Sequence, residues 1–418
     1  MPLPYLTGHI PGVGGSIKNR PEDFSVQEVP LYQPSGAGEH VYCEIRKTGL
    51  STFDAIDRIA RALHVHPRDI GYAGMKDARA VTRQILSILG ATEQAVMALQ
   101  IANLSVLWAT RHGNKLRLGH LAANRFAIKI RNPRTTDLAV LQPAVDTLTR
   151  RGMPNYFGEQ RFGRRGDNHL LGAALVRGDN DALLKLFLGS PNINVDDAQA
   201  LGARKAFDRG ELELAMKLYS RHCGMERRIL ARLIKTAKAG AAVHAIDEKL
   251  RRLWISALQS EIFNHVVTRR IDSLDRLLPG DLAYKHDNGA CFAVDDADLE
   301  QPRCHAFDIS PTGPLIGYRM TLPQGQPLEI EQAVLAAHSL APEDFRVEGR
   351  LKVKGARRPL RVQPKDMELS AGADDFGPHI TAAFTLPPGS FATVFLREIM
   401  KSQEPLPADA PAAPRGSQ

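Results

Sequence analysis

Cysteine is scarce in this chain of 418 residues, and its copies are scattered. The four cysteines are Cys43, Cys223, Cys291 and Cys304, and no two of them form a Cys-x-x-Cys step. A disulfide framework or a cysteine-based zinc site needs closer spacing than this. We therefore expect free thiols in a reducing compartment, and no metal site.

Long apolar runs are also missing. No run approaches the ~20 apolar residues that a helix needs to cross a bilayer. The first residues, Met1 to Tyr5, lack the basic-then-apolar layout of a signal peptide. The sequence thus predicts a cytoplasmic protein without a membrane partner.

Acidic charge falls short of basic charge. The formal net charge is +8, because 54 lysines and arginines face 46 aspartates and glutamates. A basic excess attracts polyanions, as a nucleic-acid-binding protein requires, but it does not distinguish RNA from DNA. A length of 418 residues also exceeds what one hydrophobic core usually supports, so we expect two domains.

One stretch carries the candidate chemistry. Residues 71–84 read GYAGMKDARAVTRQ, in which Gly71 and Gly74 suit a turn and the run from Ala80 to Ile88 is typical of a strand. The turn holds one carboxylate, Asp77, among basic residues. Taken alone, such a charge pair is typical of a solvated surface loop.

Other stretches follow in a fixed order along the chain. Residues 18–28 read KNRPEDFSVQE, residues 124–126 read NRF, and residues 155–163 read NYFGEQRFG. Further on come LQSEIFN at 258–264, SPTGPLIG at 310–317 and PPGSFATVFLRE at 387–398.

Together, these stretches resemble the motifs of the TruD family of tRNA pseudouridine synthases, and the resemblance spans Lys18 to Glu398. It implies that Asp77 is the catalytic carboxylate and that Lys18 lies near it. It also implies that the ring of Phe126 packs on the target base, and that Asn124 positions the loop or the ribose.

The fold that the resemblance implies is of the α+β class. Residues 1–154 with 357–401 would form a pseudouridine synthase core, a mixed, largely antiparallel sheet flanked by helices. Residues 155–356 would form an inserted α+β TRUD domain. Residues 402–418, rich in proline and alanine, are expected to be a disordered tail.

The implied reaction isomerises a uridine of tRNA, at position 13 by the resemblance, to pseudouridine. The N1–C1′ bond breaks and a C5–C1′ bond forms, so neither cofactor nor metal is needed and no obligatory protein partner is inferred. Asp77 would act either as nucleophile or as the base that takes a proton from C2′. The basic residues expected to contact the RNA are Lys76, Arg79, Arg161, Arg164 and Arg165.

Two other classes of function remain open from the residues. An RNA-binding protein that has lost its chemistry would keep the same basic stretches. A hydrolytic glycosidase would need two carboxylates flanking the scissile bond, whereas Glu22 and Asp23 are adjacent in a predicted strand and point to opposite faces.

The pattern also predicts local structure. Ser51 and Asp54 resemble a capping box that opens a helix, and Ser390 is expected to cap another. The near-alternation of apolar residues from Leu116 to Ile130 predicts a strand pair broken near Ala122 and Ala123.

Overall fold

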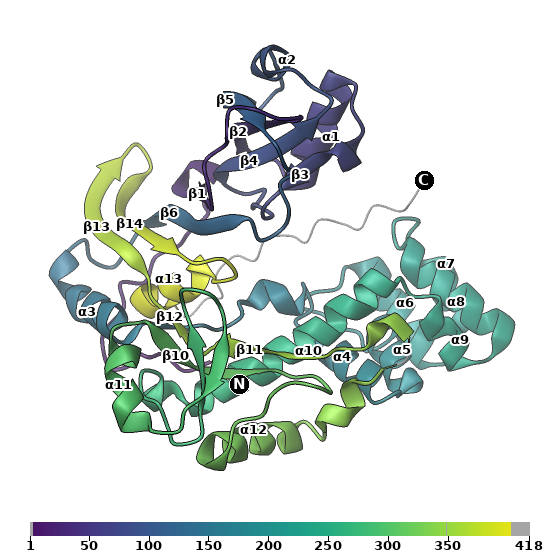
Figure 1. The fold of residues 1–418 in the computed structure, drawn as a ribbon. Coiled ribbons are helices and arrows are strands. Elements are labelled where there is room, and N and C mark those ends of the chain that lie inside the picture. Colours follow the sequence, from purple (N-terminus) through teal and green to yellow (C-terminus); the bar gives the residue numbers. More distant parts are fainter. Residues whose placement is uncertain (1–2, 348, 403–418) are drawn as a thin grey trace. The chain divides into compact units, whose positions relative to one another are not determined.

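The computed structural model describes residues 3–347 and 349–402 (Figure 1). The chain divides into two compact units. One is Tyr156–Leu360, and the other combines Pro4–Asn155 with the chain from Arg361 onward. The strand β11 (Ala356–Pro359) pairs with β10 (Ile309–Leu315) inside the inserted unit. The assignment of residues 155–356 to a TRUD domain stays a prediction.

The discontinuous unit is built on an eight-stranded sheet within the described residues, in the order β13-β14-β6-β1-β4-β2-β5 with β3 beside β4. The pair β1–β4 is parallel and the other described pairings of this sheet are antiparallel. The sheet is therefore mixed and largely antiparallel, as expected. The strands are β1 (Phe24–Pro30), β2 (His40–Thr48), β3 (Ile70–Tyr72), β4 (Val81–Leu89), β5 (Leu104–His112), β6 (Leu121–Arg131), β13 (Lys365–Asp374) and β14 (Gly377–Leu386).

Helices of this unit are α1 (Thr52–Leu63), α2 (Glu93–Met97), α3 (Gln142–Arg151) and α13 (Ala392–Met400). The predicted capping box of α1 is confirmed, since Ser51 and Asp54 satisfy each other's backbone donors. The predicted cap at Ser390 is wrong, because the N-cap position of α13 is Phe391, which makes no side-chain cap. One buried cluster joins α1 to the sheet through Val41, Cys43, Ile45, Ala55, Ile56 and Ile59.

The end of the chain returns to this unit. In Figure 1 the yellow strands β13 and β14 lie beside the blue β6, and β14 pairs with β6 from His379–Arg131 to Leu386–Asn124. The carboxylate of Glu398 accepts hydrogen bonds from the backbone N–H groups of Leu6 and Thr7. Where the chain leaves and re-enters the unit, β7 (Met153–Pro154) pairs with β12 (Arg361–Val362).

The inserted unit packs helices with a four-stranded sheet, β11-β10-β8-β9, among the described residues. Its long helix α10 approaches α4 so closely that a Cβ on Gly172 would lie 2.2 Å from the carbonyl oxygen of Trp254. The remaining elements are α4 (Asn168–Val176), α5 (Asn180–Leu188), α6 (Ala198–Asp208), α7 (Leu212–Leu218), α8 (Gly224–Thr236), α9 (Ala239–His244), α10 (Glu248–Arg269), α11 (Ala297–His305), α12 (Gly325–Ala337), β8 (Leu282–Lys285) and β9 (Cys291–Ala293).

The strand pair predicted over Leu116–Ile130 is wrong: β6 begins at Leu121 and residues 113–120 form a loop, whose Gly119 donates its N–H to the carbonyl of Ala73. Tertiary contact with the turn around Ala73 thus replaces the first predicted strand. Of the tail expected at 402–418, only Ser402 falls within the described residues.

Candidate active site

The fold joins two residues of the discontinuous unit that are far apart in sequence. Lys18 Nζ lies 3.0 Å from Asp77 Oδ2. The Lys18 side chain is 1% exposed, whereas that of Asp77 is 32% exposed. The ammonium is thus enclosed while the carboxylate keeps an open side, which is the arrangement that a carboxylate acting on a bound molecule requires.

Lys18 is held in an unfavourable backbone conformation. Its φ is 58°, in the left-handed region that costs a residue with a side chain roughly 1–3 kcal/mol. Arg131 fixes the segment on both sides: its backbone pairs with that of Ser16, and its guanidinium donates to Asp23 Oδ1 from Nε at 3.0 Å. Lys18 Nζ also lies 4.4 Å from the ring centroid of Phe24. These contacts point the ammonium to Asp77.

The turn that carries Asp77 has no regular secondary structure, but polar contacts fix its backbone. Gln84 Nε2 donates to the Gly74 carbonyl at 2.5 Å, and Thr52 Oγ1 accepts from the Lys76 N–H at 2.9 Å. Thr52 Oγ1 also lies 3.2 Å from Gln84 Oε1. The start of α1 and the strand β4 therefore hold the turn from two sides.

Gly71, at the start of the stretch, is required by close packing. A Cβ there would lie 2.3 Å from the Leu116 carbonyl oxygen and 2.5 Å from Ser87 Oγ. Gly71 is not among the glycines with a positive φ, so the close backbone approach is what excludes a side chain here.

Lys47 was missed by sequence reasoning. Its buried ammonium donates to the Leu50 carbonyl at 2.6 Å and to the backbone carbonyl of Asp77 at 3.2 Å. Lys47 thus supports the main chain of the candidate catalytic residue, Asp77. In the sequence, Lys47 directly follows the strand pattern that ends at Arg46, and nothing marks this role.

Lys76 was expected to contact RNA, but it is buried. Its Nζ lies 2.8 Å from Glu28 Oε2 and donates to Asn124 Oδ1 at 2.9 Å, and the side chains of Lys76 and Glu28 are 5% and 1% exposed. Burial raises the pKa of Glu28 above its ordinary value of 4.5, while Lys76 opposes that rise. This network links the Asp77 turn to β1 and β6, which favours a structural part for Lys76 over a phosphate contact. Through this contact with Lys76, Asn124 lies beside the turn.

Phe126 lies on β6 between its partners Val26 and Phe384 in the sheet. Its ring stacks on that of Phe384 with a centroid separation of 5.3 Å and meets Phe24 edge-on at 6.4 Å. The residue is 8% exposed. Because Phe24 also contacts Lys18 Nζ, the three rings form an apolar layer next to the Lys18 ammonium.

Arg79 is exposed, as a phosphate contact requires. Its neighbour Arg83 is engaged: two of its nitrogens donate to the carboxylate oxygens of Glu44, each at 2.8 Å, and Trp108 Nε1 donates to the same carboxylate at 2.9 Å. The basic residues of the stretch thus divide between solvent and the fold.

The three arginines of the inserted unit that are expected to contact RNA also divide into exposed side chains and side chains engaged in the fold. Arg164 is exposed. Arg165 pairs with Asp167 and Asp196, and so holds the fold. Arg161 donates to Ser256 Oγ at 2.8 Å and Ser260 Oγ at 3.2 Å, and burial lowers its pKa.

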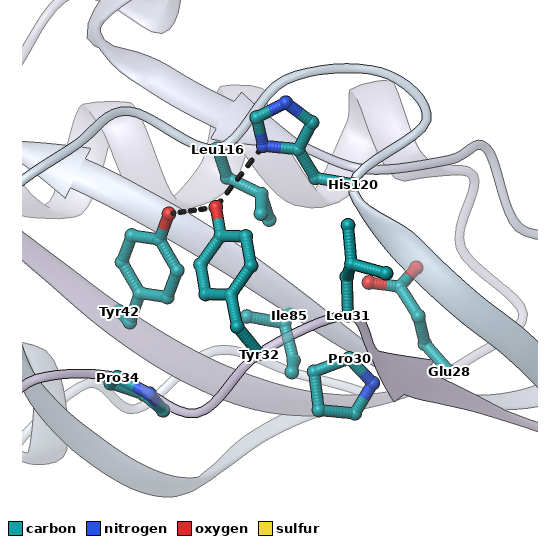
Figure 2. Close-up of a pocket in the computed structure, with 9 residues that line it drawn as sticks. All are labelled: Glu28, Pro30, Leu31, Tyr32, Pro34, Tyr42, Ile85, Leu116 and His120. Carbon is teal, nitrogen blue, oxygen red and sulfur yellow. Dashed lines mark hydrogen bonds between the residues drawn. The ribbon is translucent and has the colours of Figure 1, made fainter. Parts of the chain in front are cut away.

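A small pocket of the discontinuous unit has Glu28 in its lining, as Figure 2 shows. Tyr32, whose hydroxyl is 3.3 Å from that of Tyr42 and 3.1 Å from His120 Nδ1, crosses it. The cavity volume is about 10 Å³, roughly the room of one water molecule. A nucleobase therefore does not fit in this pocket.

The chemistry available is that of one presented carboxylate. Glu28, which pairs with Lys76 beside the turn, is enclosed, so it is not offered as a second acid flanking a glycosidic bond. Within the described residues, no cluster of three or more His, Cys, Asp or Glu side chains is placed to hold a metal ion. No helix in the described part of the chain has the length and hydropathy of a membrane span.

Comparison with known proteins identifies relatives of this chain. The family description "tRNA pseudouridine synthase D (TruD)" matches residues 2–399. A tRNA pseudouridine synthase D of Geobacter metallireducens is 48% identical over 96% of this chain and 98% of its own, and one of an Anaeromyxobacter species is 38% identical over 97% of each. The crystal structure of a Methanosarcina mazei protein described as TruD superposes with a TM-score of 0.84 at 28% identity, covering 96% of this chain and 99% of that one. The chain therefore belongs to the TruD family of tRNA pseudouridine synthases.

Proposed function

We propose that this enzyme converts a uridine of tRNA, at position 13, to pseudouridine, with Asp77 as the catalytic carboxylate. The observation that carries the proposal is the Lys18–Asp77 pair of 3.0 Å, with an enclosed ammonium and a partly open carboxylate. Its substrate makes the cytoplasm, where tRNA is found, the expected place of action.

The reaction must break the N1–C1′ bond, turn the uracil and join C5 to C1′. Asp77 serves in one of two ways. As a nucleophile, its oxygen bonds to C1′ as the uracil leaves with the bonding electron pair, and C5 later displaces it. As a base, it takes the C2′ proton and returns it after C5 has bonded to C1′. In both cases C5 loses its proton and N1 gains one, so the overall reaction is an isomerisation.

Lys18 keeps the carboxylate charged and oriented. An ammonium at hydrogen-bond distance stabilises the anion and fixes which oxygen faces outward. Because the Lys18 side chain is enclosed, it does not need to be ordered when substrate binds. The orientation of the Asp77 carboxylate is therefore set before binding.

Phe126 and Asn124 serve the base and the turn. We propose that the Phe126 ring retains the detached uracil by stacking, as aromatic side chains do with everted bases. Asn124, as an acceptor of the Lys76 ammonium, keeps the turn in register with β6. We assign phosphate contacts to the exposed Arg79 and Arg164, and leave Lys76, Arg161 and Arg165 to hold the fold.

The test uses an unmodified tRNA transcript carrying tritium at C5 of its uridines, and a second transcript with cytidine at position 13. The wild-type protein should release one equivalent of tritium from the first transcript and none beyond background from the second. Binding without tritium release would favour an RNA-binding protein that has lost its chemistry. Release of free uracil would favour a hydrolytic glycosidase. Equal release from both transcripts would refute position 13.

A further inference from the structure

A larger cavity lies wholly within the inserted unit and has a volume of about 410 Å³. One wall is a single face of α10, formed by Arg252, Ile255, Ser256 and Gln259, whose spacing of three and four residues aligns them along the helix. The other wall is the segment from Leu351 to Ala356 together with Leu315 at the end of β10. The volume falls in the ~300–1,000 Å³ range of small-molecule sites.

The lining changes from apolar to basic. Ile255 and Leu351 are buried and give an apolar floor. Ser256 and Gln259 add polar groups, while Lys352 and Lys354 are exposed at the rim. A flat heterocycle suits the floor and an attached phosphate suits the rim, a combination that a nucleotide has.

The walls are fixed before any ligand arrives. The N–H groups of Tyr318 and Arg319 donate to the carbonyls of Val353 and Lys354 at 3.1 and 3.0 Å. Gly317 packs so tightly on Gly355 that a Cβ on Gly317 would lie 2.2 Å from the Gly355 nitrogen. A site held in this way binds with a small ordering cost.

The charge at the rim is unbalanced. Arg252 is paired with Glu248 at 2.9 Å on the same helix. Among the described residues, by contrast, no ion pair involves Lys352 or Lys354, and no aspartate or glutamate lines the cavity. The rim therefore attracts an anion, and the cavity itself lacks the carboxylate that the isomerisation needs.

We propose that this cavity binds one nucleotide of the RNA strand, distinct from the uridine that is isomerised, with its base on the apolar floor and its phosphate between Lys352 and Lys354. The identification of the strand as tRNA rests on the proposed function. The cavity then helps to select the RNA, while the reaction stays with Asp77.

The first test removes the rim charges. Full-length Lys352→Ala/Lys354→Ala protein should bind the tRNA transcript about tenfold more weakly, with the salt dependence of log Kd reduced by about one to two. Its kcat should remain within about twofold of wild type. The matched control, Lys205→Ala/Lys217→Ala, removes two exposed lysines from α6 and α7 of the same unit. An equal loss in the control, or no loss in either, would overturn the proposal.

A second variant fills the cavity without changing charge. Ala356→Phe places a ring in the cavity from the exposed start of β11, and it should raise KM for tRNA several-fold with little change in kcat.

A benzophenone amino acid at position 356 should cross-link to one nucleotide of the transcript, and cross-links spread evenly along the RNA would contradict a specific site. Adding 5′-AMP distinguishes an RNA strand from a free nucleotide as the ligand. If micromolar 5′-AMP prevents cross-linking from position 356 while the KM for tRNA is unchanged in both variants, the ligand is a free nucleotide and the proposal fails. One pair of results would refute the proposed function but support the role of the cavity. In that case the wild-type protein forms no pseudouridine, and the Lys352→Ala/Lys354→Ala variant still binds RNA more weakly than the wild type.

Discussion

Lys18 and Asp77 stand 59 positions apart in the sequence, yet the Lys18 ammonium donates to the Asp77 carboxylate at 3.0 Å. Each partner is fixed from a different part of the sheet: Arg131 of β6 pins the segment that holds Lys18, and Gln84 of β4 pins the turn that holds Asp77. The geometry of the pair is therefore a property of the whole sheet, and changes at several sites that contact no substrate should alter catalysis.

Replacement of Lys18 by methionine should slow the chemical step while leaving tRNA binding intact. The carboxylate would lose the partner that orients it, and misplacement of a catalytic group costs on the order of 100-fold in rate. The rate of single-turnover tritium release should show this loss, and KM for tRNA should stay within about twofold of the wild-type value. A Lys18→Met enzyme with wild-type kcat would show that the ammonium is dispensable.

Replacement of Glu28 by glutamine should destabilise the discontinuous unit. It leaves the buried Lys76 ammonium without its carboxylate, and breaking a buried pair on one side costs about 3–5 kcal/mol. The thermal unfolding midpoint of the full-length protein should therefore fall clearly. The double variant Glu28→Gln/Lys76→Met, which removes the buried charge, should recover part of the loss. Equal stability of wild type and Glu28→Gln would contradict a stabilising role for this pair.

Two variants at Phe126 distinguish a packing role of the ring from a base-stacking role. Phe126→Ala should lose about 3–5 kcal/mol, as large-to-small changes of buried aromatic residues do, because the ring lies between Phe24 and Phe384. Phe126→Leu keeps most of the apolar volume and should fold, but it should form pseudouridine more slowly if the ring retains the base. The comparison is made on urea unfolding curves and on single-turnover rates. A Leu variant that is fully active would leave Phe126 as a core residue only.

The inserted unit should lose stability as the pH falls below about 6.5. Burial lowers the pKa of His338, whose Nε2 lies 3.1 Å from Nδ1 of His265, while Glu261 opposes that shift. Burial likewise lowers the pKa of His169. The unfolded chain then takes up protons at a higher pH than the folded one, so stability is complete above 6.5 and is lost as the pH falls towards the lowered values.

The measurement is the unfolding midpoint of the full-length protein between about pH 8 and about pH 5.5, across the range in which histidines titrate. His338→Asn should flatten its decline with falling pH. His222→Asn, at an exposed position of the same unit, is the control and should follow wild type. Parallel curves for wild type and His338→Asn would contradict the prediction.

The strand expected from Ala80 to Ile88, observed at Val81–Leu89, and the helix cap at Ser51 followed from local rules, since periodicity and capping depend on neighbours in the chain. The α+β class followed from the family resemblance. The pairing of Lys18 with Asp77 followed from family resemblance alone. Burial was harder to predict. Lys76, next to Asp77, reads as a surface cation, and only the fold brings Glu28 to it. The Leu116–His120 segment alternates like a strand but packs on the Ala73 turn instead.

The most direct test of this account is the single-turnover rate of tritium release by Asp77→Asn, with Asp375→Asn, a change at an exposed carboxylate of the same unit, as the control. The amide keeps the size of the side chain, so tRNA binding and the unfolding midpoint should stay close to wild type. The account predicts a rate reduced by at least about 1,000-fold for Asp77→Asn, as expected when a nucleophile or general base is lost, and an unchanged rate for Asp375→Asn. Tritium release by Asp77→Asn at the wild-type rate would remove Asp77 from the mechanism.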